Sequence, residues 1–301
     1  MTDHAAIDRD QEDRLFLLRN ALEQRLLQLL PAYGEENRIS QAMSDATLTQ
    51  GKRIRPLLLL LTAQDLAKGT LPSGSLELAC AIEFVHAASL MLDDLPCMDN
   101  AQLRRGQPTI HCQYGQDVTL LAAVALLSLA FSVIANTDKL SAQQRTLAVS
   151  ELAKSIGSQG LVMGQYQDLS AGKTERSSEA INQTNALKTS TLFDAAFQLA
   201  AIAADASSDQ QQALHTIALE LGQAFQLLDD LSDGAPDSGK EQNKDQGKST
   251  LVNLLGHASA RQQLLSHLQR ADAQFSLVSN EYQLTQHFIS FWFHQRLASL
   301  D

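Results

Sequence analysis

Two apolar segments of the chain each end in a pair of adjacent aspartates, and this arrangement limits how the chain can fold. The first pair, Asp93 and Asp94, stands just before Pro96, which cannot continue a helix without losing a hydrogen bond and clashing one turn back. The second pair is Asp229 and Asp230. Both segments have the apolar spacing of a helix. Acids at the negative C-terminal end of a helix repel one another unless cations neutralise them, so the pattern predicts two helices that bring acidic ends to a cation site.

Magnesium is the cation that the two acidic motifs predict. Asp229 and Asp233 are four residues apart and therefore project from one face of a helix. Mg²⁺ prefers oxygen ligands, keeps several waters and usually shares its shell with substrate phosphates. One such string in an acidic protein is typical of a solvated helix end, whereas two favour a site that holds several ions and a diphosphate. The candidate catalytic residues and metal ligands are Asp93, Asp94, Asp99, Asp229, Asp230 and Asp233.

Composition favours a single helical domain. The 301 residues include only 15 glycines and 6 prolines, and aromatic residues make up 5%. Alanine, leucine and glutamine dominate and β-branched runs are few, which favours α-helices over strands. No repeat and no long linker divides the chain. We therefore expect residues 1–301 to form one all-α bundle around a central cavity.

The charge balance limits the possible partners. A formal net charge of -11 and the lack of a basic stripe argue against binding to nucleic acid. An anionic substrate would be held by metal ions and a few local cations. Three cysteines without metal-ligand spacing argue against a disulfide framework or a zinc site and fit a reducing cytoplasm. The acidic N-terminal stretch lacks the features of a secretory signal.

One segment is apolar enough to raise the question of a membrane span. Residues 118–135 are apolar except for Thr119, Ser128 and Ser132, which is close to the minimum length for a span. The segment has no flanking basic residues and no aromatic belt, and it is rich in alanine. We therefore expect a buried helix here and no membrane span.

Cationic residues stand near the first acidic motif. Lys52 and Arg55 lie in the string GKRIRP, which by itself predicts a basic loop between helices. His86 lies seven residues before Asp93 and therefore on nearly the same helix face. A single histidine in an apolar helix is usually a core residue, but this one is aligned with the acids.

The combined motifs resemble those of the trans-prenyl diphosphate synthases. Bacterial members of that family carry DDxxxxD followed by RRG, and then DDxxD; this chain has both, at residues 93–99, 104–106 and 229–233. Over nearly its whole length the chain is most similar to the geranylgeranyl diphosphate synthases of bacterial carotenoid pathways. Further matching strings are GKRIRP, HAASLMLDDLPCMD, RRGQPTIH, KTSTLF, LGQAFQLLDD and GKSTLVNLLG.

The resemblance implies an activity and a set of substrate contacts. The activity is a Mg²⁺-dependent, sequential head-to-tail condensation of isopentenyl diphosphate with dimethylallyl, geranyl and farnesyl diphosphates, which gives geranylgeranyl diphosphate. The family also implies a cytoplasmic homodimer. Met163 departs from the family's GGQxxD pattern, although Gln165 and Asp168 are present. The implied substrate-binding residues are Lys52, Arg55, His86, Arg104, Arg105, Lys188, Thr189, Gln226, Lys240 and Lys248.

The same resemblance suggests how product length is set. Farnesyl-making bacterial relatives typically carry an aromatic residue five positions before the first aspartate, where this chain has Ala88, followed by Ser89. One helical turn, about 5.4 Å, is comparable to one isoprene unit. An open position at Ala88 favours a longer product, and Phe84, one turn deeper, is the expected lower stop.

Other readings of the motifs are a farnesyl diphosphate synthase of the same family and a catalytically silent subunit of a prenyltransferase. A class I terpene cyclase usually has a second metal motif of another type, and a silent subunit would be expected to lose motif acids. A calcium-binding loop of the EF-hand type would need alternating acids and a central glycine. The string GKST at residues 247–250 is not a P-loop, because Gln242 occupies the position of the required glycine.

Overall fold

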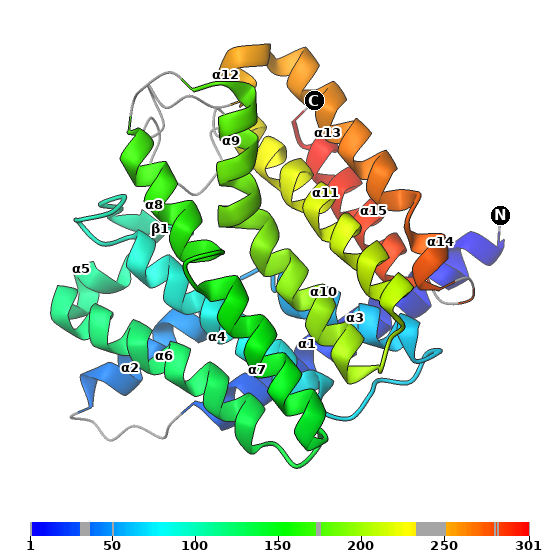
Figure 1. Cartoon of the computed structure of the whole chain (residues 1–301), viewed down its shortest axis with the longest axis horizontal. Coiled ribbons are helices and arrows are strands. Elements are labelled where there is room, and N and C mark those ends of the chain that lie inside the picture. Colours follow the sequence, from blue (N-terminus) through cyan, green and yellow to red (C-terminus); the bar gives the residue numbers. More distant parts are fainter. Residues whose placement is uncertain are drawn as a thin grey trace.

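Helices form almost all of the regular structure, as the composition predicted, and the all-α fold class is confirmed (Figure 1). The structure is a computed structural model that describes residues 2–30, 37–49, 51–172, 176–232, 251–279, 281 and 283–300, with side chains from residue 12 onward. The first nine elements are α1 (Thr2–Leu29), α2 (Arg38–Leu48), α3 (Ile54–Leu66), α4 (Ser75–Asp93), β1 (Leu103–Arg104), β2 (Gln107–Pro108), α5 (Ile110–Tyr114), α6 (Gln116–Asn136) and α7 (Ala142–Ile156). The others are α8 (Leu161–Ala171), α9 (Ser178–Asn185), the π-helical turn η1 (Ala186–Ser190), α10 (Thr191–Ala203), α11 (Ser208–Ser232), α12 (Leu251–Leu255), α13 (His257–Asp272), α14 (Phe275–Val278) and α15 (Leu284–Ala298).

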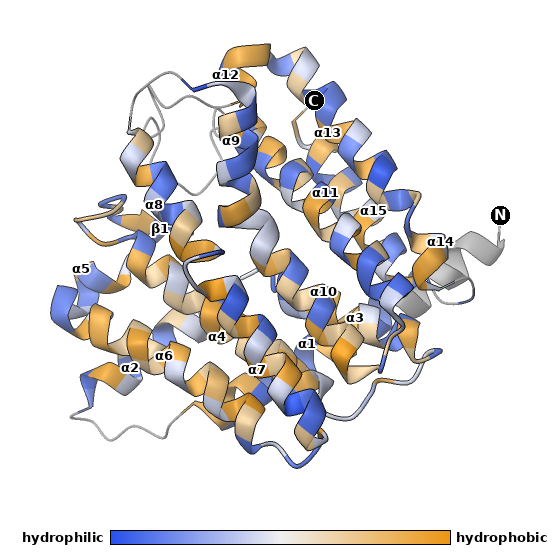
Figure 2. Ribbon diagram, viewed as in Figure 1, coloured by the Kyte–Doolittle hydropathy of each residue, from blue (hydrophilic) through white to orange (hydrophobic). Residues whose placement is uncertain are grey.

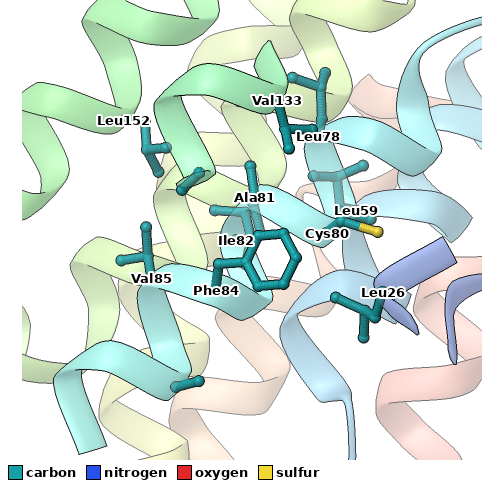
Figure 3. Packing of buried hydrophobic residues seen from close by; sticks show 14 of the residues in the cluster. Leu26, Leu59, Leu78, Cys80, Ala81, Ile82, Phe84, Val85, Val133 and Leu152 are labelled. Carbon is teal, nitrogen blue, oxygen red and sulfur yellow. The ribbon is translucent and has the colours of Figure 1, made fainter. Parts of the chain in front are cut away.

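Two adjoining hydrophobic cores hold the bundle together. The first surrounds α4, and Figure 3 shows Phe84 within it, close to Leu26, Leu59 and Cys80. The second lies among α10, α11, α13 and α15. Helix α3 serves both cores, since Leu59 faces the first and Leu58 the second. A helix that is apolar all round is buried on all sides, and the leucine run at residues 57–61 is buried throughout.

The first acidic motif lies where α4 ends. The chain leaves the helix in a tight turn in which the amide of Asp99 donates to the carbonyl of Asp93 (2.9 Å) and the amide of Ala101 to the carbonyl of Asp94 (3.1 Å). Pro96 has no amide hydrogen to continue the ladder. The C-terminal ends of α4 and α11 point to the same end of the bundle, with α10 packed between the two helices (Figure 1).

A small hairpin, which the sequence patterns did not predict, follows this turn. Strands β1 and β2 pair antiparallel, with Arg104 opposite Gln107. The two residues between them, Arg105 and Gly106, both have positive φ, 54° and 76°. Two-residue hairpins favour this conformation because its twist matches the strands. The string RRG therefore builds a turn that brings Arg104 back towards α4.

Helix α6 corrects the prediction of a buried helix. One face packs against α4 and α2, but Leu120, Leu121 and Val124 are 45%, 56% and 63% exposed. Apolar residues dominate this helix in Figure 2. Within the described part of the chain, α4 and α6 are the two helices that are long and apolar enough to cross a membrane by length and composition alone. Because most of α4 is buried in the bundle, that helix is a core helix.

Candidate active site

The end of α4 holds a carboxylate that is already paired with an arginine. The Nε of Arg104 donates to both carboxylate oxygens of Asp94, at 2.9 and 2.8 Å, and Nη2 lies 2.6 Å from Oδ1. Asp94 is buried. Burial alone would lower the pKa of Arg104, but Asp94 and the nearby Asp93 and Asp99 raise it above its usual value. In this geometry Asp94 positions Arg104.

Asp93 is half-buried and lies near two other acids, Asp94 and Asp99. Burial raises the pKa of its carboxyl to about 6, and Asp99 and Asp94 add to the rise, whereas Lys188 and Arg104 oppose it. A carboxylate destabilised in this way gains most from a cation brought beside it. This environment favours cation binding at Asp93.

The second acidic motif is connected to η1 by hydrogen bonds. The hydroxyl of Thr189 donates to Oε1 of Gln226 (3.1 Å), and Nε2 of Gln226 donates to Oδ1 of Asp230 (2.8 Å). Gln226 lies one turn before Asp230 on α11, so the two side chains share a helix face. The chain of contacts fixes both the amide orientation and the carboxylate of Asp230.

Lys188 lies between the two sides of the site. Its ammonium group bonds Asp168 on α8 (2.8 Å). Burial would lower the pKa of Lys188, but Asp168 and then Asp93 raise it, with Asp99 adding to the effect. The lysine therefore stays charged and lies within the electrostatic reach of the first motif. Asp168, which the sequence marked only through an imperfect motif, is its direct partner.

The acidic residues suit magnesium, although the described ones do not form a complete coordination shell. Among the residues that the structure describes, no three His, Cys, Asp or Glu side chains converge closely enough to hold a metal ion. Mg²⁺ takes one or two carboxylates from the protein and completes its shell with water and phosphate. Separate oxygen donors on α4 and α11 match that requirement. Asp233, Lys240 and Lys248 lie outside the described residues.

Arg55 provides one cation of the predicted diphosphate site. Burial lowers the pKa of Arg55 to about 10, with Glu83 and Asp229 opposing and Arg105 adding to the shift. Its guanidinium carbon lies 4.6 Å from the ring centre of Phe193 and 5.8 Å from that of Phe225. These rings position the guanidinium by cation–π contact, and the buried Nε has no hydrogen-bond partner.

His86, Arg105 and Lys52 lie around the same region. Burial and the charges of Arg55 and Arg105 hold the pKa of His86 well below its usual value, so the imidazole is neutral at pH 7. Burial also lowers the pKa of Arg105, although Glu83 opposes this. Lys52 extends over the ring of Trp292, 5.4 Å from its centre. The site therefore concentrates positive charge, which an anion would stabilise.

The predicted chain-length residues lie on α4, away from the apolar pocket of the structure. Phe84 and Ala88 are fully buried, and the Ser89 hydroxyl donates to the carbonyl of His86 (2.9 Å). A small apolar pocket lies instead among α3, α10, α11 and α15, and none of its lining residues comes from α4. The placement of the product floor at Ala88 and Phe84 stays a prediction.

Two glycines let neighbouring helices approach η1. A Cβ on Gly164 of α8 would come within 2.6 Å of the amide nitrogen of Lys188, and a Cβ on Gly222 of α11 within 2.5 Å of the Cα of Ser190. Both close approaches involve backbone atoms of η1 and cannot be relieved by a rotamer change. The turn that presents Lys188 and Thr189 is therefore clamped from both sides.

Replacing Gly222 with alanine is expected to displace this turn. Insertion of a methyl group into a packed interior costs roughly 1–3 kcal/mol, and here the shift also separates Thr189 from Gln226. We expect a lower melting temperature and a higher KM for the allylic substrate. Calorimetry and steady-state kinetics measure the two effects; an unchanged melting temperature would contradict the close packing.

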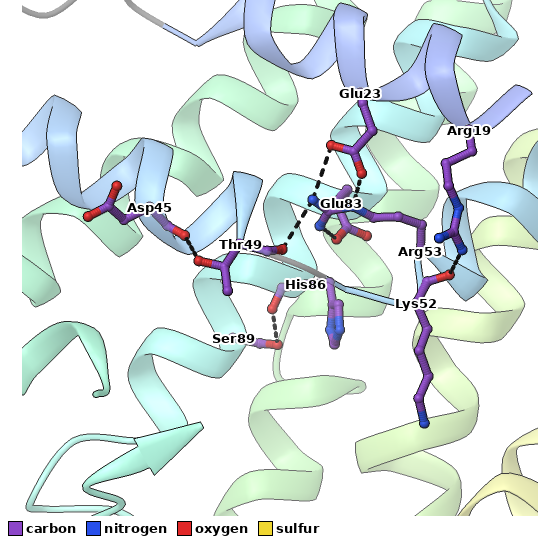
Figure 4. A network of polar contacts seen from close by, with 9 residues as sticks. All are labelled: Arg19, Glu23, Asp45, Thr49, Lys52, Arg53, Glu83, His86 and Ser89. Atoms are coloured by element: carbon purple, nitrogen blue, oxygen red, sulfur yellow. Dashed lines mark hydrogen bonds and ion pairs between the residues drawn. The ribbon is translucent and has the colours of Figure 1, made fainter. Parts of the chain in front are cut away.

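Sequence reasoning missed the buried ion pair of Arg53 and Glu83. Arg53 was passed over between Lys52 and Arg55, but Figure 4 shows its guanidinium beside Glu83 and Glu23. The available signal was Glu83 itself, because a charged residue inside an apolar helix is seldom buried without a partner.

Comparisons with known proteins agree with this arrangement. Residues 36–284 match the family described as polyprenyl synthetase. The chain is 54% identical to the geranylgeranyl diphosphate synthase of Pantoea ananas, over 99% of this chain and 98% of that protein. The apo structure of an FPP/GFPP synthase from Zymomonas mobilis has a TM-score of 0.83 at 30% identity and covers 94% of this chain and 98% of its own.

A second solved structure is similar across the same length. The geranyltransferase from Helicobacter pylori, complexed with magnesium and isoprenyl diphosphate, has a TM-score of 0.79 at 26% identity, with 96% of each chain covered. The family match covers most of the chain, and the motifs, the helical fold and the clustered acids and cations all agree with it. This chain belongs to the polyprenyl synthetase family.

Proposed function

We propose that the chain is a geranylgeranyl diphosphate synthase that condenses isopentenyl diphosphate head to tail with dimethylallyl, geranyl and farnesyl diphosphates. The observation that carries the proposal is the meeting of two unlike sites at one end of the bundle. One is a pair of acidic helix ends with Lys188 and Arg104, and the other is a cation cluster around the neutral His86. The relative from Pantoea ananas, itself a geranylgeranyl diphosphate synthase, supports this choice of product.

The acidic side suits departure of the allylic diphosphate. Bound magnesium would act as a Lewis acid that stabilises the charge developing on the leaving group, held by Asp93, Asp94, Asp99, Asp229, Asp230 and Asp233. Arg104 and Lys188, both kept charged by neighbouring carboxylates, would bind the same oxygens. Because Arg104 already bonds Asp94, we propose that Asp94 has a second role, which is to hold that arginine in place.

The cationic side suits isopentenyl diphosphate. Lys52, Arg55 and Arg105 would hold its phosphates, and the neutral His86 can donate a hydrogen bond without adding charge. Fixing the double bond against the allylic carbon is a positioning effect, which lowers the barrier by removing the entropy of encounter. Apolar side chains around the reacting carbons exclude water, which would otherwise quench the allylic cation.

A labelled-substrate assay tests the proposal. Isopentenyl diphosphate is supplied with each allylic diphosphate in turn, with Mg²⁺ or with a chelator, and the dephosphorylated products are sized. We expect geranylgeraniol from all three primers and none with the chelator. A product that stops at farnesol would leave the prenyltransferase activity but overturn the assigned product, and the absence of any Mg²⁺-dependent product would favour the silent-subunit reading.

We further propose that the enzyme is a cytoplasmic homodimer of single-domain chains, which feeds carotenoid and other isoprenoid synthesis. The support for the dimer is the exposed apolar face of α6, formed by Leu120, Leu121 and Val124, with Leu147 of α7 48% exposed. Helices α6 and α7 pack together. Exposed apolar side chains gathered on one helix face are typical of an interaction surface.

Replacing Leu121 and Val124 together by glutamate is expected to split the dimer. Two charges on each copy would face the partner across an apolar contact, where unpaired charge is strongly unfavourable. Sedimentation velocity should show a monomer at concentrations where the parent protein is a dimer. Leu277→Glu, at an equally exposed leucine of α14, is the matched control and should leave the mass unchanged; a dimeric double variant would contradict the proposed interface.

A further inference from the structure

We propose that Glu83, acting through Arg53, is a positioning residue that assembles the cations of the isopentenyl diphosphate site before substrate arrives. The inference rests on the proposed function, since it assigns a further residue to that site. Neither residue was among the expected substrate contacts. Both are buried, at 3% and 4% exposure, and Figure 4 shows their ion pair.

Arg53 is anchored on three sides. Its Nη1 lies 2.5 Å from Oε1 of Glu83, its Nε lies 2.7 Å from Oε1 of Glu23, and its Nη2 donates to the carbonyl of Thr49 at 3.3 Å. These contacts tie the loop before α3 to α1, α2 and α4. A charge-assisted contact in a buried place fixes geometry more tightly than a surface pair does.

The anchor sets the direction of the residues on either side of it. Arg53 has a left-handed backbone conformation, with φ of 51°, which non-glycine residues adopt only where contacts hold them. Its side chain points into the protein, and Figure 4 shows Lys52 extending away from the ion pair. Arg55 follows in the first turn of α3. Without the contacts of Arg53, the backbone would leave this conformation. The side chains of Lys52 and Arg55 would then point in other directions.

Arg105 belongs to the same assembly through Gly51. A Cβ built on Gly51 would lie 2.6 Å from Nη1 of Arg105 and 3.3 Å from Nη1 of Arg53. The guanidinium groups of Arg105 and Arg53 therefore both lie beside Gly51, and their like charges repel each other. The Glu83 carboxylate, bonded to Arg53, supplies the opposing charge.

The position of Glu83 on α4 connects this assembly to His86. The two residues are three positions apart and lie on one face of the helix. Oε2 of Glu83 is buried and has no hydrogen-bond partner. One carboxylate oxygen thus anchors Arg53, while the charge of the group acts on the neighbouring guanidinium groups, including Arg55 and Arg105.

The charge-neutral variant Glu83→Gln separates positioning from simple charge. If only net charge mattered, removing a carboxylate would make the site more positive and tighten diphosphate binding. If Glu83 instead positions the cations, removing its carboxylate should weaken diphosphate binding. We expect the KM for isopentenyl diphosphate to rise by about tenfold, with the KM for farnesyl diphosphate and kcat changed by less than about twofold.

Glu77→Gln is the matched control. Glu77 is also a buried glutamate of α4, bonded to Arg25 and Lys139 through Oε1, and its Oε2 likewise has no hydrogen-bond partner. It lies in the first turn of the helix, away from the residues around His86. We expect Glu77→Gln to lose a similar amount of stability but to keep the parental KM for isopentenyl diphosphate. The difference in KM between the two variants therefore measures the effect on the site alone.

A double-variant cycle tests the route through Arg53. Arg53→Met is expected to raise the same KM at least as much, and the combination with Glu83→Gln is expected to be no worse than Arg53→Met alone, because both changes remove the contact between Arg53 and Glu83. Additive losses would overturn the route. Glu83→Asp, which keeps the charge but shortens the side chain, is expected to be intermediate and carries the test if the glutamine variant does not fold.

Binding of inorganic pyrophosphate, measured by titration calorimetry on the full chain without Mg²⁺, gives a readout independent of turnover. About tenfold weaker binding to Glu83→Gln than to the parent protein supports the proposal; equal or tighter binding overturns it. A parent protein that binds pyrophosphate but makes no prenyl product would instead contradict the proposed function, so the two failures are distinguishable.

Discussion

Replacing Asp93 with alanine is expected to lower kcat by roughly 10³-fold, the scale observed when a preorganised electrostatic contact to developing charge is removed. Burial raises the pKa of the Asp93 carboxyl to about 6. Its loss would remove a proposed metal ligand and leave Lys188 with less opposing charge. The KM for isopentenyl diphosphate is expected to change little, because that substrate belongs to the cationic side. Turnover at an Mg²⁺ concentration that just saturates the parent protein measures the effect.

The control for this change is Asp209→Ala, at an exposed aspartate at the start of α11, which should retain parental kcat. Raising Mg²⁺ tenfold tests the assigned role further. Partial recovery of the Asp93→Ala variant would indicate weakened metal binding. Near-parental turnover at ordinary Mg²⁺ would contradict the assignment of Asp93 to the metal site.

Replacing Ala88 with tyrosine is expected to move the main product from geranylgeranyl to farnesyl diphosphate. Ala88 lies five residues before Asp93 on α4, which corresponds to about 7.5 Å along the helix axis. A tyrosine ring there would block a growing chain before it reaches the level of Phe84. The similar fold of an FPP/GFPP synthase from Zymomonas mobilis fits this view, because side chains and not the fold would then decide product length. Chromatography of the dephosphorylated products measures the shift.

Ala87→Tyr distinguishes a blocked tunnel from general overpacking. Ala87 is also buried on α4, but its side chain projects about 100° away around the helix. Both variants are expected to lose roughly 1–3 kcal/mol of stability from the added volume. Only Ala88→Tyr should shorten the product. An unchanged product profile in Ala88→Tyr would show that the floor lies elsewhere, for example nearer the pocket between α3 and α15.

The features predictable from sequence were those with a strong local signal. Apolar periodicity and proline placed the end of α4, and the helical fold followed from composition. The hairpin at Arg105 and Gly106 was missed because a two-residue turn between two-residue strands leaves no alternating apolar pattern to detect. The exposed face of α6 was missed for a different reason: an apolar helix with one exposed face has the same composition as one that is buried on all sides.

Contacts between distant segments were less accessible. The pairing of Lys188 with Asp168 spans two helices, and that of Arg53 with Glu83 joins a loop to the middle of α4. Nothing in a single sequence states which cation faces which acid. Arg53 and Arg55 are two positions apart and chemically identical, and only tertiary packing makes one an internal anchor and the other a candidate ligand.

The π-helical turn at Ala186–Ser190 makes the length of this segment as important as its composition. Each residue of an α-helix turns the chain by about 100°, and a π-helical turn accommodates one more residue than an α-helical turn. Deleting a single residue here would let the backbone relax into an ordinary helix, but it would also rotate everything before the deletion relative to α10. Lys188 and Thr189 could then no longer face Asp168 and Gln226 together. In this chain, a one-residue insertion or deletion within this segment should therefore disturb the site more than a change of a single exposed side chain.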